Sequence, residues 1–416
     1  MTSARTAPTL PALVAAATLL LALAEFGQVW YYPAPEPDAE LVRAFGGAFR
    51  FGLWLAAGAC ILAHLIRRGA GPTLGALAPF VPFLIWGAAA TAFWSIDRTA
   101  GIRALTFWSL AAGLAAAAGA ELGPRTLARG TALLFLAVVA GSLAAALLAP
   151  AAATMAYGDA TAVRGLFPHK NAFGWFCGLG LVWSVGTRRA LGGTLAAAVV
   201  VTMLAGLLAS GSKTAAAVLP TVGAYALGLG LCRRAFPEGA QAALALALLG
   251  AAAALVAVAI APLAVESVER YATFTGRTDV WRHYLAYLHE RPLTGYGAGI
   301  LSSDTELNRA IGAAVPGYEA QRLRSPHSLY IGLASESGLV GLAFFVAAHA
   351  WIAVVAPFRD LTPWSRIAGA LAVAILLAGV TEMRDGFLPG TATLLLVAAR
   401  AAALRDPPGR HALPGE

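Results

Sequence analysis

The chain has 416 residues, of which 59% are hydrophobic and only 12% are charged. Soluble domains are about one-quarter charged, so this composition excludes an ordinary soluble protein and indicates one surrounded by lipid. The net charge is +8, but the arginines are dispersed among loops, which favours membrane orientation over nucleic-acid binding.

Apolar runs recur along the chain, and each is long enough to cross roughly 30 Å of hydrocarbon. Because a backbone in lipid must satisfy its own hydrogen bonds, continuous runs without period-two alternation predict helices. We predict an all-α polytopic membrane protein with about twelve transmembrane helices. The predicted spans are residues 8–27, 47–66, 74–95, 101–119, 128–148, 171–187, 192–209, 214–231, 240–262, 328–355, 365–381 and 388–404.

These spans divide the chain into a transmembrane bundle over residues 1–262, a long loop over 263–327, further spans over 328–404 and a tail over 405–416. Alternate short loops carry arginines, and with a cytoplasmic N-terminus these loops form the positive, cytoplasmic side. They contain Arg67, Arg68, Arg125, Arg129, Arg188, Arg189, Arg233, Arg234, Arg359 and Arg366. The C-terminus then also lies in the cytoplasm, and the long loop lies outside.

The long loop collects ionisable side chains: Arg270, Arg277, Arg282, Arg291, Arg309, Arg322, Arg324, His283, His289 and His327. An amphipathic helix is indicated by the spacing of Trp281, Tyr284, Leu285 and Leu288. This helix should start near Thr278, end before Pro292 and lie on the membrane surface or the top of the bundle. A second helix should begin at Ser303, with Glu306 completing a capping box.

Arg277 and His327 stand near predicted helix starts. Gly276 lets the backbone bend, so the Arg277 guanidinium and the helix N–H groups are suited to a phosphate oxygen. Alternatively, Arg277 ties the loop down through a nearby carboxylate. Residues 325–327 read as N-cap, N1 and N2 of the next span, which favours a neutral, proton-accepting His327 imidazole. The alternative is a surface histidine at the membrane interface.

Further candidates lie at other predicted outer boundaries. Lys213 is either a snorkelling interfacial lysine or a cation for an anionic head group. The run R-G-L-F-P-H-K-N places Arg164, His169, Lys170 and Asn171 at one boundary. This run either anchors the interface, with Asn171 capping a helix, or contributes to the same anion site.

Two acidic positions have alternative interpretations. Glu336 lies inside a span, where a carboxylate is costly and is a functional candidate, although it also suits a hydrogen bond between helices. Near the last outer turn, Glu382, Arg384 and Asp385 suit either an internal salt bridge or a place in the site. Arg282 and Arg324 are further candidates within the long loop.

Several kinds of site are not indicated. Cys60, Cys177 and Cys232 lie in or beside apolar runs without ligand spacing and are interpreted as core residues. The sequence has no Walker loop, H-E-x-x-H, D-x-D-type pair or G-x-S-x-G elbow, and its G-Y-G-A-G lacks a strand–turn–helix setting. We therefore expect neither a metal nor a cofactor.

Three segments in order resemble the signature of the O-antigen ligase and polymerase superfamily. They are T-G-R-T-D-V-W (275–281), R-P-L-T-G-Y-G-A-G (291–299) and P-H-S-L-Y-I-G-L-A-S-E-S-G-L-V-G (326–341). The resemblance extends over roughly residues 160–350 and implies a GT-C-like glycosyltransferase of the bacterial inner membrane. It implies that Arg277 binds a diphosphate and that His327 is the catalytic base.

The family resemblance also assigns the remaining cations. Lys213 matches a position that is often arginine, and Arg164, His169, Lys170 and Asn171 match an outer-edge motif. Lysine keeps the charge but lacks the planar, bidentate fork of arginine. Ser328 stands where many members have asparagine, so a side-chain role there is not carried over.

The implied activity is that of an O-antigen ligase with a periplasmic site. The donor would be O-antigen on undecaprenyl diphosphate, and the acceptor would be lipid A–core oligosaccharide. An O-antigen polymerase would share the donor but use a lipid-linked acceptor. A protein O-glycan ligase is disfavoured by the short tail after the last span. A lipid-linked glycan flippase is the alternative from another class, and a structural scaffold agrees least with the clustered motifs.

Overall fold

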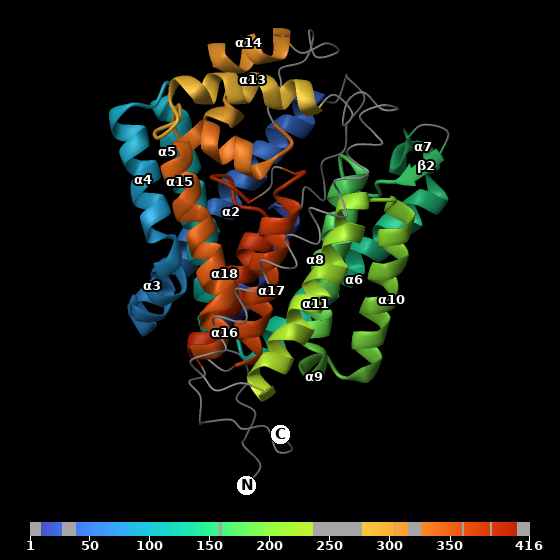
Figure 1. Cartoon of the computed structure of the whole chain (residues 1–416). Coiled ribbons are helices and arrows are strands. Elements are labelled where there is room, and N and C mark those ends of the chain that lie inside the picture. Colours follow the sequence, from blue (N-terminus) through green and yellow to red (C-terminus); the bar gives the residue numbers. More distant parts are fainter. Residues whose placement is uncertain are drawn as a thin grey trace.

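The computed structural model describes residues 10–26, 39–157, 160–235, 277–303, 305–314, 326–359, 362–382 and 385–405. These residues form an almost wholly helical bundle (Figure 1), as long apolar runs in lipid require. In this part of the chain the only strands form a short antiparallel hairpin, β1 (Thr154–Tyr157) and β2 (Ala160–Val163), with Thr154 opposite Val163.

The long helices are α1 (Leu10–Phe26), α2 (Ala39–Arg68), α4 (Val81–Phe93), α5 (Arg98–Glu121), α6 (Pro124–Leu148), α8 (Lys170–Gly186), α10 (Gly193–Ser210), α11 (Lys213–Ala235), α15 (Leu329–Val354), α17 (Pro363–Ala378) and α18 (Thr391–Arg405). The short helices are α3 (Gly71–Leu77), η2 (Ala78–Phe80), α7 (Pro150–Ala153), α9 (Arg188–Leu191), α13 (Arg277–Glu290), η3 (Ile300–Ser302), α14 (Glu306–Ala314) and α16 (Ala356–Arg359).

Seven helical segments of the described residues are long and apolar enough to cross a membrane. They are Phe49–Arg68, Thr73–Phe93, Arg98–Glu121, Pro124–Leu148, Gly193–Ser210, Lys213–Cys232 and Leu329–Arg359. The predicted span at 240–262 lies outside the described residues, and every other predicted span coincides with helix. The polytopic helical class is therefore confirmed, whereas the count of about twelve spans stays a prediction.

Small side chains build the centre of the bundle. Residues 111–120 of α5 and 391–403 of α18 are all buried. At Gly119, an added Cβ would overlap the carbonyl of Ala398 on α18, so the two helix backbones are in close contact. Lipid supplies no hydrophobic drive between helices, and close packing through small residues takes its place.

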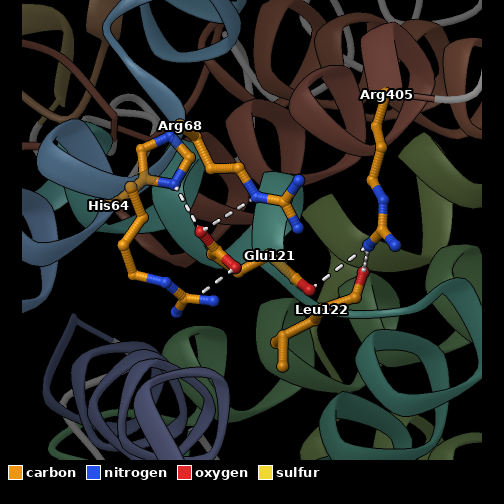
Figure 2. A network of polar contacts seen from close by, with 6 residues as sticks. His64, Arg68, Glu121, Leu122 and Arg405 are labelled. Atoms are coloured by element: carbon orange, nitrogen blue, oxygen red, sulfur yellow. Dashed lines mark hydrogen bonds and ion pairs between the residues drawn. The ribbon is translucent and has the colours of Figure 1, made fainter. Parts of the chain in front are cut away.

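Arginines at the ends of α2 and α18 lie around Glu121, the last residue of α5 (Figure 2). The Glu121 carboxylate is hydrogen-bonded to His64 Nδ1 at 3.1 Å and lies 3.8 and 3.7 Å from guanidinium nitrogens of Arg67 and Arg68. Arg405 donates to two carbonyls at the C-terminal end of α5, at 3.3 and 2.7 Å. Arg67, Arg68 and Arg405 belong to segments predicted to share one side of the membrane, and they do lie together.

The opposite end carries α13 and α14, at the top of Figure 1. α13 ends before Pro292, as predicted. Its buried face is formed by Val280 and Tyr284, whereas Leu285, predicted on that face, is 49% exposed. The buried face is therefore set by packing against α15 and by the neighbouring cluster of apolar side chains, not by spacing alone.

The predicted start of the second loop helix at Ser303 is wrong. α14 begins at Glu306, and the Thr305 hydroxyl accepts a hydrogen bond from the Asn308 N–H at 3.2 Å. The Ser303 hydroxyl instead donates to Ile300 O at 2.9 Å and closes the preceding turn. Both Ser303 and Thr305 carry a hydroxyl that could cap α14. Because the Ser303 hydroxyl is bonded within the turn at η3, Thr305 caps the helix.

Candidate functional site

His327 lies immediately before α15. Its φ of 53° is left-handed, a conformation that few non-glycine residues adopt. Because α15 begins at Leu329 and Ser328 is its N-cap, the predicted N2 position of His327 is wrong. The residue still stands at the positive end of a helix and is partly exposed. A strained backbone that is held by its surroundings is frequent at functional sites.

The start of α15 is fastened to the turn that follows α17, residues 379–382, which we call the hub turn. The Leu329 N–H donates to Gly379 O at 2.7 Å, and the Ser328 hydroxyl donates to the same oxygen at 3.4 Å. The backbone beside His327 is thereby fixed to the hub turn.

The hub turn also holds the starts of α8 and α11. The hydroxyls of Thr381 and Thr214 share a hydrogen bond of 3.1 Å, directly beside Lys213. Asn171 Nδ2 donates to Glu382 Oε1 at 3.0 Å, and Glu382 is buried. Segments that are far apart in the sequence therefore meet at one turn.

Two lysines lie close together beside the hub turn. Lys170 is 5% exposed, and its Nζ donates to Gly211 O at 3.3 Å, at the C-terminal end of α10. Burial, and then the charge of Lys213, lower the pKa of Lys170 from its usual 10.5. Lys213 is exposed at the first position of α11. Two neighbouring cations with mutual repulsion favour the binding of an anion between them.

His169, not Asn171, caps α8. The backbone at His169 is extended, and its Nδ1 accepts a hydrogen bond from the Asn171 N–H at 3.1 Å. The predicted cap role of Asn171 is therefore wrong. Its side chain instead reaches Glu382 in the hub turn.

Arg164 contacts a different part of the protein. Its guanidinium donates to Ala152 O through Nε at 3.1 Å and Nη2 at 2.8 Å, at the base of the β1–β2 hairpin. These contacts agree with the alternative in which this residue anchors the loop.

α13 connects Arg277 to the segment that carries His327. Arg277 is the first residue of α13, in agreement with its predicted place at a helix start. One turn later, Trp281 Nε1 donates to Pro326 O at 2.7 Å. Arg282 is exposed on α13. Arg324 lies outside the described residues, as does most of the long loop before Arg277.

The G-Y-G-A-G motif is a structural joint. Gly295, Gly297 and Gly299 have φ of 64°, 127° and 71°. The loop lies against α15 where that helix is broken at Gly338 (φ 66°, ψ −178°). A Cβ on Gly295 would lie 2.6 Å from Gly338 N, so a side chain is not tolerated there.

The two acidic candidates have structural contacts. Glu336 is 2% exposed, and its Oε1 accepts from the Leu301 N–H at 3.3 Å, which is the predicted alternative of a bond between segments. Asp385 Oδ1 accepts from Gly390 N at 3.0 Å and from the N–H and hydroxyl of Thr393 at 2.9 Å each, and so caps α18. Arg384 lies outside the described residues.

The chemistry of the site is that of bases and cations. Among the described residues no group of three His, Cys, Asp or Glu side chains is placed to hold a metal ion.

Sequence reasoning missed Thr214, Thr381 and the role of Glu382. The one available signal was Glu382 at a predicted outer span end, because threonines at helix ends have many ordinary roles.

Residues 198–346 match the model of a protein family described as O-Antigen ligase. The matched segment contains Lys213, Arg277, His327 and Glu336, and it confirms the family resemblance of the motifs. A comparison with curated proteins found no match to the chain.

Proposed function

We propose that this chain, whose residues 198–346 match the O-Antigen ligase family model, is a membrane glycosyltransferase of ligase type. It would transfer O-antigen from undecaprenyl diphosphate to lipid A–core oligosaccharide at the periplasmic face of the bacterial inner membrane. The observation that carries this proposal is the meeting of the segments bearing His327, Lys213 and Lys170 around the hub turn, at one end of a helical membrane bundle.

A lipid-linked donor agrees with this placement. Nucleotide sugars and ATP belong to the cytoplasm, so a donor used outside must bring its leaving group with it. A lipid diphosphate does so and keeps the sugar beside the membrane helices. Lys213, Lys170 and Arg277 would bind the diphosphate, so that preorganised cations stabilise the charge that develops on the leaving group.

The proposed reaction is a single displacement. An acceptor hydroxyl oxygen attacks the anomeric carbon, and His327 takes the hydroxyl proton. The bond from the anomeric carbon to the diphosphate oxygen breaks, and its electron pair leaves with undecaprenyl diphosphate. Attack from the opposite face inverts the anomeric configuration. The position of His327 at a helix N-terminus favours the neutral imidazole that this step needs.

The direct test uses purified protein in lipid nanodiscs with lipid-linked glycan and lipid A–core, without ATP or added metal. Glycan on lipid A–core that is lost with His327→Ala supports the proposal. Glycan that lengthens only on the lipid carrier identifies a polymerase instead. Lipid-linked glycan that crosses the bilayer without forming any product identifies a flippase. Either of these two outcomes rejects the ligase.

A further inference from the structure

The break in α15 has almost all of its polar groups satisfied. The carbonyls of residues 335–337 accept hydrogen bonds of 2.7–2.9 Å from Tyr296 N, Gly297 N and Trp86 Nε1. On the other side of Gly338, the Leu339 N–H donates to Pro292 O at 2.8 Å. A broken membrane helix is tolerated only where other protein groups provide such partners.

Two buried polar atoms at this joint differ from the rest. The Tyr284 hydroxyl and Glu336 Oε2 make no hydrogen bond within the described residues, and the two residues are 0% and 2% exposed. They are near each other: Tyr284 packs in the same apolar cluster as Leu301, whose N–H donates to Glu336 Oε1 at 3.3 Å, and α13 is in contact with α15. One is a donor and the other an acceptor, so they are chemically complementary. Buried polar atoms are seldom left without a partner, so each such atom calls for an explanation.

The position of this pair links it to the proposed site. Tyr284 lies on α13, about two turns after Arg277. Glu336 lies on α15, the helix that follows His327. The contact of Trp281 with Pro326 already joins the first turn of α13 to the segment before α15. A second contact, between Tyr284 and Glu336, would fix the orientation of α13 as well as its distance.

We propose that Tyr284 and Glu336 are positioning residues: in the substrate-bound enzyme the Tyr284 hydroxyl donates to the Glu336 carboxylate and holds α13, with Arg277, against α15, with His327. The inference rests on the proposed function, in which Arg277 and His327 act on the same donor. Glu336 touches no reacting atom in this account and acts through the placement of α13.

Tyr284→Phe tests the pair because it removes the hydroxyl and keeps the ring packing. Tyr296→Phe is the matched control: Tyr296 belongs to the same cluster, and its hydroxyl donates to Tyr287 O at 2.9 Å and Glu290 Oε2 at 2.8 Å. A purely structural role predicts that Tyr296→Phe is the more damaging change. Positioning predicts about a tenfold loss of kcat for Tyr284→Phe, and less than about twofold for Tyr296→Phe.

A second measurement needs no turnover. Amide hydrogen exchange over residues 280–290 is followed in the full-length protein with and without undecaprenyl diphosphate. The lipid diphosphate should slow exchange in the wild type and in Tyr296→Phe, and this slowing should be absent in Tyr284→Phe and in Glu336→Met, which has no oxygen acceptor. The double variant of Tyr284 and Glu336 should lose no more kcat than the worse single variant, because both changes break one contact.

Equal slowing of exchange in the wild type and in Tyr284→Phe overturns the inference, and so does a double variant whose loss is the product of the single losses. The proposed function fails by a different result. If undecaprenyl diphosphate slows exchange of α13 in the wild type and in Tyr296→Phe but not in Tyr284→Phe, and no glycan is transferred, the positioning contact stands and the transferase assignment falls.

Discussion

At one end of the bundle, Glu121 lies among His64, Arg67 and Arg68, whereas at the other end Lys170 and Lys213 lie near each other beside the hub turn. The first arrangement surrounds one buried carboxylate with opposite charge, and it joins α2 to α5. The second places like charges together, which lowers the stability of the charged forms. One end uses charge to hold helices, whereas under the proposed function the other end keeps charge for a ligand.

The largest expected effect is at the lysine end. His327→Ala should reduce glycan transfer by about 10²- to 10⁴-fold, because a general base is removed from the reaction. Thermal unfolding in nanodiscs is measured alongside, so that loss of the base is separated from loss of the fold. Transfer within about twofold of the wild type would remove the base from the mechanism.

Glu121→Ala should give the largest loss at the arginine end, and in stability only. It leaves the buried His64 without its partner, at a cost of about 1–3 kcal/mol in the free energy of unfolding. Arg67 and Arg68 are 36% and 57% exposed, so solvent screening reduces their share. Thermal unfolding measures the loss, and Glu121→Gln, which keeps an acceptor, is the control. An unchanged kcat is expected, and a large fall in kcat would contradict the division between the two ends.

The lowered pKa of Lys170 predicts a pH dependence at the lysine end. The KM for the donor should rise as the ammonium loses its proton, at a pH below the usual 10.5. Donor binding therefore weakens as the pH rises, whereas the folded state becomes more stable. The unfolded chain holds this proton more tightly, so the free energy of unfolding rises with pH over the same interval. Lys170→Arg stays protonated and should abolish both changes. An alkaline rise in KM that persists in Lys170→Arg would assign it to another group.

The smallest expected effect separates two residues of one sequence motif. Asn171→Ala removes a hydrogen bond to Glu382 and should lower transfer several-fold, at about 1 kcal/mol per bond. Arg164→Ala removes contacts to Ala152 at the hairpin and should leave kcat unchanged. Initial rates at saturating donor compare the two variants. Equal losses in both would mean that the motif acts as one unit.

The ends of the helices show where sequence reasoning succeeded and where it failed. The end of α13 before Pro292 and a helix start near Thr278, observed at Arg277, were predicted because proline and glycine act on the local backbone. The start of α15 was placed three residues early, since Pro326 favours a helix start but His327 adopts a left-handed turn instead. Asn171 was assigned to a cap because its amide contact with Glu382 spans 211 positions of sequence.

The sequence by itself determined the polytopic helical class and the resemblance to the O-antigen ligase family, because hydropathy and short motifs are local properties. Only the tertiary structure decided that residues 379–382 join three helix starts, that the glycine motif fills the break in α15, and that Tyr284 and Glu336 both lie near Leu301. Such contacts depend on how helices distant in sequence pack, and small residues allow many packings that a pattern of apolar runs does not distinguish.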